Sequence, residues 1–62
     1  MADRLLDAQA VADMIGMRPD YIYRLVRRDE IPHLRFGRTV RFRPEAIADW
    51  LEQEERGNGR AR

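Results

Sequence analysis

A glycine and a proline, three residues apart, separate two helix-length segments in the first half of the chain. Apolar residues before Gly16 recur at the three- and four-residue spacing of a helix that packs along one face, and Asp7 is a suitable N-cap. Gly16 tolerates the left-handed conformation that ends a helix, and Pro19 fits the first position of the following helix. The sequence therefore predicts a helix over 8–15, a tight corner and a second helix from Pro19.

The residues around this corner have the spacing of a helix-turn-helix. Two helices that cross steeply through a short turn need a small residue at the crossing and a glycine at the corner, and Ala12 and Gly16 meet these needs. The positions predicted to pack the two helices together are Val11, Met14, Ile15, Ile22, Leu25 and Val26. Any tight helical hairpin would share the alanine and the glycine, but it would have no reason to carry arginines on the outer face of its second helix.

The second helix, within the stretch 18–28, does carry such a face: at 100° per residue, Asp20, Arg24 and Arg27 lie opposite the packing positions. A lone helix of this composition is most often a surface helix with solvated arginines. The distribution of charge argues against that interpretation. Residues 18–43 contain eight arginines and three acidic residues, a balance of +5, whereas residues 1–17 and 44–62 each sum to −2. This asymmetry indicates an anion-binding centre between acidic margins.

Beyond residues 31–32, which end the helical pattern, the periodicity changes to strict alternation. Residues 33–36 and 40–43 alternate apolar with basic side chains, so the sequence predicts a β-hairpin with a three-residue loop over 37–39. The apolar side chains expected on the face toward the helices are Leu34, Phe36, Val40 and Phe42. The basic face leaves two interpretations open: a wing that contacts DNA, or an edge hairpin that uses charge to prevent aggregation.

Pro44 is expected to begin a third helix, in which Ile47, Trp50 and Leu51 recur at helical spacing. Trp50 lies on this apolar stripe, so we expect it to cover the core rather than to stack on a base. The outer face of the helix is acidic and should face away from DNA. Residues 56–62 contain two glycines and no apolar residue larger than alanine, which predicts a disordered tail.

Together these elements predict an α+β fold, a small winged helix-turn-helix. It has three helices and a two-stranded antiparallel hairpin, the wing, between the second and third helices. The expected domain covers residues 1–55, and the tail covers residues 56–62. A domain of this size has no room for an enclosed active site.

The composition also excludes several classes of protein. With no cysteine, no serine and a single histidine, we expect no disulfide, no catalysis, no metal, no cofactor and no small-molecule ligand. No apolar run approaches the ~20 residues that span a bilayer, and the N-terminus lacks the features of a signal peptide. We therefore expect a cytoplasmic protein without a membrane partner, located at the nucleoid when bound to DNA.

Six segments in this order resemble the excisionase family, small winged helix-turn-helix proteins related to the DNA-binding domains of MerR-type regulators. The segments are LLDAQAVADMIGM (5–17), YIYRL (21–25), IP (31–32), RFGR (35–38), FRPE (42–45) and WL (50–51). The resemblance implies a recognition helix in the major groove and a wing beside the adjacent minor groove. It also implies a recombination directionality factor, which binds repeated sites near the attachment site of a mobile element, bends the DNA and promotes excision by a tyrosine-type integrase.

The chain departs from that family pattern at two helix starts. Asp7 stands where a threonine is usual, and it should cap the first helix equally well. Arg18-Pro19 stands where a serine often precedes the recognition helix, so a cation replaces a neutral cap at the positive end of a helix. A DNA phosphate beside Arg18 would compensate for that replacement.

The candidate DNA-binding residues fall into three groups. Residues at the beginning and on the outer face of a recognition helix reach base edges, and those are Asp20, Tyr21 and Arg24. The residues expected to contact phosphates are Arg18, Tyr23, Arg27 and Arg28. The residues expected to contact DNA from the wing are Arg35, Arg38, Thr39 and Arg41.

The expected partners are double-stranded DNA, an integrase and further copies of the chain, since one recognition helix binds weakly and adjacent sites favour cooperative binding. Two other functions are compatible with parts of the sequence. A small transcriptional regulator of phage or island genes would have the same fold. A protein-interaction module, such as an assembly or antitoxin subunit, would show no salt-sensitive DNA binding.

Overall fold

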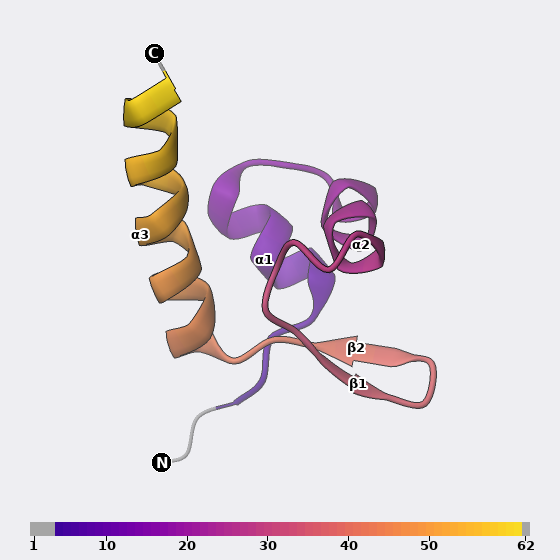
Figure 1. The fold of residues 1–62 in the computed structure, drawn as a ribbon. Coiled ribbons are helices and arrows are strands. Elements are labelled where there is room, and N and C mark those ends of the chain that lie inside the picture. Colours follow the sequence, from indigo (N-terminus) through magenta and orange to yellow (C-terminus); the bar gives the residue numbers. More distant parts are fainter. Residues whose placement is uncertain (1–3, 62) are drawn as a thin grey trace.

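The computed structural model describes residues 4–61, and it describes the side chains of residues 4–56. Its elements are α1 (Ala8–Ile15), α2 (Pro19–Arg27), β1 (Leu34–Phe36), β2 (Thr39–Arg41) and α3 (Pro44–Ala61). In the view of Figure 1, α1 lies between α2 and α3, and the β1–β2 hairpin extends below α2. The predicted fold, a small α+β domain with a hairpin between the second and third helices, is confirmed.

The corner between α1 and α2 forms as the sequence predicts. The Asp7 carboxylate accepts a hydrogen bond from the backbone N–H of Ala10 at 2.9 Å, which caps the first turn of α1. Gly16 has a φ of 71°, and the N–H of Met17 donates to the carbonyl oxygen of Ala12 at 2.8 Å. These bonds satisfy the carbonyl groups at the end of α1 and turn the chain toward α2.

The core draws on α1, α2, the hairpin and α3. Its buried members are Ala8, Val11, Ala12, Ile22, Leu25, Val26, Ile31, Val40, Phe42 and Ile47. The prediction for α2 is confirmed, but the prediction that Met14 packs in α1 was wrong, since 54 % of that side chain is exposed. Ala8 completes the buried face of α1 instead, because the 3.6-residue period places it between Val11 and Ala12 and leaves Met14 outside.

The hairpin turn is shorter than predicted. Phe36 pairs with Thr39, so the loop contains two residues, Gly37 and Arg38, instead of three. Gly37 has a φ of 66°, and two-residue hairpin loops of type II′ place a glycine at this first position. The left-handed backbone of Gly37 therefore closes the hairpin one residue earlier than we expected.

This shorter loop corrects the predicted faces of the hairpin. Opposed residues in an antiparallel pair point to the same face, and successive residues along a strand point to opposite faces. Leu34 and Phe36 therefore lie on the face opposite Val40 and Phe42, and not beside them as predicted. Val40 and Phe42 are buried, Leu34 is half-buried and Phe36 is 56 % exposed. A change of one residue in register exchanges the two faces of a strand.

The segment before α1 is bonded to the residue that follows β2. The N–H of Leu6 donates to the carbonyl oxygen of Phe42 at 2.7 Å, and the N–H of Phe42 donates to the carbonyl oxygen of Leu6 at 2.8 Å. Phe42 is fully buried, so this backbone bridge lies directly over the core. The bridge ties the base of a two-stranded hairpin, which would be marginal alone, to the helical part of the fold.

Trp50 links α3 to the end of α2. Its indole N–H donates to the carbonyl oxygen of Glu30 at 3.1 Å, and its half-buried ring packs against the core. Ile47 is fully buried and Leu51 is half-buried on the same stripe. The prediction that Trp50 covers the core is confirmed.

The helix α3 continues beyond the predicted end of the domain. We expected a disordered tail from Arg56, whereas the helix extends to Ala61. No proline interrupts residues 45–62, and each residue added to an existing helix forms a backbone hydrogen bond without a new nucleation step. The domain boundary at Glu55 itself stays a prediction.

Asp29 ends α2 in a conformation that favours glycine. Its φ is 56°. The N–H of Asp29 donates to the carbonyl oxygen of Val26 at 3.0 Å, and the N–H of Glu30 donates to the carbonyl oxygen of Leu25 at 2.9 Å. This is the bond pattern of a Schellman motif, in which the left-handed residue is usually glycine. An aspartate there bears both backbone strain and a negative charge at the negative end of the helix.

Replacing Asp29 with glycine should therefore stabilise the protein by about 0.5–1 kcal/mol, since glycine relieves the strain but loses more entropy on folding. The midpoint of thermal unfolding should rise by several degrees in a domain of this size. Asp29→Asn is the control, because it removes the charge and keeps a residue that tolerates the left-handed region. A glycine variant no more stable than the asparagine variant would show that the backbone is not strained.

Candidate nucleic-acid interface

The outer face of α2 is basic and fully separated from the packing face. Ile22, Leu25 and Val26 are buried on one side of the helix. The exposed residues of this segment are Arg18, Asp20, Tyr23, Arg24, Arg27 and Arg28. The helix therefore presents its cations to solvent without burying any of them, and a polyanion has direct access to them.

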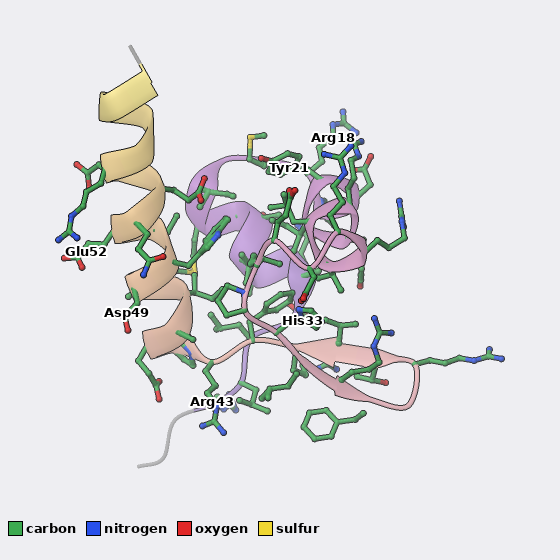
Figure 2. All side chains as sticks on the ribbon, viewed as in Figure 1. Arg18, Tyr21, His33, Arg43, Asp49 and Glu52 are labelled. Atoms are coloured by element: carbon green, nitrogen blue, oxygen red, sulfur yellow. The ribbon has the colours of Figure 1, made fainter. Side chains whose placement is uncertain are left out.

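The beginning of α2 lacks a side-chain cap. Arg18 is the N-cap residue, and its side chain makes no capping hydrogen bond. The carbonyl oxygen of Arg18 accepts from the N–H of Tyr21 at 3.0 Å, and Pro19 occupies the first helical position. The first amides of a helix favour anions, and the exposed guanidinium of Arg18 stands at this end (Figure 2).

The three residues predicted to read bases do not have equal access to a ligand. Asp20 and Arg24 are exposed on the outer face of α2. Tyr21 is half-buried and packs against the core, since it lies next to Leu25 around the helix. Its ring is therefore in part a structural element, and only the remaining part faces solvent.

The predicted wing residues likewise differ in exposure. Arg35, Arg38 and Thr39 are exposed, and Arg38 lies in the two-residue loop. Arg41 is half-buried, and its guanidinium donates to the carbonyl oxygen of Val40 at 2.8 Å. That bond holds Arg41 against the strand, so the freely accessible cations of the hairpin are Arg35 and Arg38.

His33, the single histidine, lies just before β1 and is half-buried. Its Nδ1 is 2.8 Å from the carbonyl oxygen of Ile31, so it donates to that oxygen in the tautomer that protonates Nδ1. This hydrogen bond therefore stabilises the connection between α2 and the hairpin.

Positive and negative side chains lie on different sides of the fold. Figure 1 shows α2 and the hairpin turn on the side of the molecule away from α3. Figure 2 shows Asp49 and Glu52 on the side of α3 that is turned away from α1 and α2, while Arg43 lies near the start of α3, away from α2. The basic surface is thus built by α2 and the hairpin turn, and the prediction that the acidic face of α3 points away from them holds.

No pocket is found in the part of the chain that the structure describes. Among the same residues, no three histidine, cysteine, aspartate or glutamate side chains are close enough to hold a metal ion. No helix over residues 4–61 is long and apolar enough to cross a membrane. The described surface therefore offers charged faces rather than a cavity for binding.

Sequence reasoning missed two features of this region. The Leu6–Phe42 bridge has no local signal, because it joins residues far apart in the chain. The exposure of Phe36 beside the hairpin turn was not predicted, because the predicted three-residue loop placed Phe36 on the face toward the helices. The only available signal was the glycine at 37, which fits the first position of a two-residue loop as well as a longer one.

Comparison with known proteins identifies one family. The family model described as a helix-turn-helix domain matches residues 5–55, which include α1, α2, the hairpin and the first part of α3. This is a DNA-binding family that includes excisionase-like proteins, and its members are typically not enzymes. Neither the comparison with curated proteins nor the comparison with solved structures gave a match.

Proposed function

The chain belongs to the helix-turn-helix domain family, and on this basis we propose that it binds specific sequences in double-stranded DNA. In this proposal α2 enters the major groove and the hairpin lies beside the adjacent minor groove. The observation that carries it is the separation of faces on α2, where buried apolar residues oppose exposed arginines. The hairpin turn, which contains the exposed Arg38, lies on the same side of the molecule as α2 (Figure 1).

The exposed residues have distinct proposed roles. Arg24 projects from the centre of the outer face and is the proposed partner of a guanine, since its planar fork matches the O6 and N7 acceptors. Asp20 and the exposed part of Tyr21 are proposed to contact neighbouring bases. The remaining residues, which are proposed to contact phosphates or the minor groove, are Arg18, Tyr23, Arg27, Arg28, Arg35, Arg38, Thr39 and Arg41.

Binding should depend strongly on salt. With about five phosphates neutralised, log K should fall with log[salt] at a slope of about −4 to −5. The measurement is fluorescence anisotropy of a labelled duplex, titrated with the protein at several salt concentrations. Arg27→Ala should flatten the slope by about one unit because it removes one phosphate contact.

The control for this prediction lies on α3. Glu52→Ala removes an exposed charge on the side turned away from α2, so the slope should keep its wild-type value (Figure 2). Binding that is insensitive to salt would contradict the proposal and would favour a protein-interaction module instead.

We further propose that the biological role is excisive recombination, at the nucleoid in the cytoplasm. Support comes from the family, which includes excisionase-like proteins, and from the resemblance of six segments to excisionases. In this role several copies bind adjacent repeated sites cooperatively, bend the DNA and promote excision by a tyrosine-type integrase. A single domain of this size offers one recognition helix, so cooperation between copies would supply the required affinity.

An excision assay tests this role directly. A tyrosine-type integrase encoded beside this gene would be incubated with its own attachment-site DNA, with and without the protein. The proposal predicts excision only when the protein is present, and footprints that fill adjacent sites together rather than independently. Specific DNA binding without any effect on excision would assign the protein to transcriptional regulation on the same fold.

A further inference from the structure

A large apolar side chain is exposed beside the hairpin turn. Phe36 is 56 % exposed, which exceeds every other large hydrophobic side chain in the described part of the chain. It is the last paired residue of β1, opposite the exposed Thr39 and directly before the two loop residues. Because Val40 and Phe42 occupy the other face of the hairpin, the core does not cover this ring.

The surroundings of Phe36 are cationic. Arg38 is exposed in the two-residue loop that follows Phe36, whereas the exposed Arg35 is paired with Val40 and lies on the opposite face of the hairpin. Arg41 lies on the same face as Phe36, with its guanidinium held against the strand. An aromatic ring beside Arg38 and Arg41 is complementary to DNA, whose phosphates are anionic and whose base faces become accessible to an apolar side chain when a base step unstacks.

We propose that Phe36 is an apolar wedge that enters a base step in the minor groove beside the site bound by α2. The proposal rests on the proposed function, because the hairpin reaches this groove only when α2 is in the major groove. Apolar side chains that insert between base pairs partly unstack them and kink the duplex by about 20–90°. The preferred step is pyrimidine–purine, since such steps unstack most easily.

The wedge gives the hairpin a function that its arginines alone cannot perform. Arginine in the minor groove senses groove width and attracts the backbone, but it leaves the bases stacked. Two alternatives would also explain the exposed ring. Single exposed apolar side chains are common on protein surfaces and need no ligand, or the ring contacts a second copy of the chain. Both of these alternatives leave base stacking unchanged, so local stacking distinguishes them from the wedge.

The experiment measures stacking in a duplex selected from a random library by binding to the wild-type protein. The fluorescent base 2-aminopurine replaces each adenine in turn, and its emission rises when its neighbours unstack. Wild-type protein should raise the emission several-fold at one step beside the site of α2. Phe36→Leu should keep most of this rise, whereas Phe36→Ala should abolish it and weaken binding by roughly tenfold.

Met14→Ala is the matched control, since Met14 is a large apolar side chain of nearly the same exposure, 54 %, but lies on α1 and has no proposed contact with DNA. It should keep the wild-type emission. Because Phe36 lies outside the core, Phe36→Ala should also keep the wild-type thermal transition.

Four results would overturn the wedge. If the wild-type protein binds with salt-sensitive affinity but changes no emission, or if Phe36→Ala acts like wild type, DNA binding stands and the wedge fails. If Phe36→Ala loses only cooperation between adjacent sites, Phe36 contacts a second copy instead. If the wild-type protein binds no duplex, the proposed function fails and the wedge fails with it.

Discussion

Phe42→Ala is expected to unfold the protein. Phe42 is among the largest fully buried side chains, and replacing a buried phenylalanine with alanine costs about 3–5 kcal/mol. A single core in a chain of this length supplies only about 3–5 kcal/mol of stability. The variant should therefore show no cooperative thermal transition when unfolding is followed by circular dichroism.

Phe36→Ala is a control of the same chemistry, since it deletes an exposed phenylalanine from the same hairpin. It should keep the wild-type midpoint. A Phe42→Ala variant that unfolds cooperatively within a few degrees of wild type would show that the core does not depend on the Phe42 side chain.

The second large effect concerns Arg24. Arg24→Ala should weaken binding to the selected duplex by about 10- to 100-fold, because a bidentate contact with guanine contributes about 1–3 kcal/mol of discrimination. Binding to a random duplex should fall much less, since nonspecific affinity depends on the number of phosphate contacts. The measurement is competition between the selected duplex and variants with each base pair changed.

Arg27→Ala is the matched control for Arg24→Ala, because both remove an exposed arginine from the same face of α2. It should weaken binding to all duplexes to a similar degree and leave the base preference intact. If both variants change only the salt slope, the proposed division between base-reading and phosphate-binding residues is wrong.

The helices of this fold could be predicted because short-range chemistry determines where they begin and end. Asp7 caps α1, Gly16 adopts the left-handed conformation, and Pro19 begins α2, all within the range of a few residues. The buried face of α2 also followed from its 3.6-residue period. Met14 was misplaced because α1 is short and the small Ala8 carries little hydrophobic signal, although it is fully packed.

The hairpin faces could not be predicted, because register depends on a single residue of loop length. Gly37 is compatible with loops of two or three residues. The loop length decides whether Phe36 lies on the same face of the hairpin as Val40 or on the opposite face. The bridge between Leu6 and Phe42 is equally invisible in the sequence, since it forms only when distant segments pack together. The left-handed conformation of Asp29 was missed because aspartate signals it far more weakly than glycine.

The sequence predicted which residue types form the candidate site better than it predicted how buried or accessible each side chain is. The alternation of arginines around α2 and the turn identified the exposed cations Arg24, Arg27 and Arg38. The partial burial of Tyr21 and the backbone bond of Arg41 depend on neighbouring elements, so periodicity did not reveal them.

The central claim, that α2 lies in the major groove with the hairpin at the adjacent minor groove, can be tested by tethered DNA cleavage. The chain contains no cysteine, so single cysteines at three positions can each carry an iron chelate that cuts nearby DNA. The substitutions are Arg28→Cys at the C-cap of α2, Thr39→Cys in the hairpin and Asp49→Cys on the acidic side of α3.

On the selected duplex, the chelate at 28 should cut in the major groove. The chelate at 39 should cut in the minor groove about half a helical turn, or about 5 base pairs, away. The chelate at 49 should leave the duplex intact, because that side of α3 faces away from α2 (Figure 2). Cutting from position 49 as strong as that from position 28, or cutting in one groove from both 28 and 39, would contradict the account.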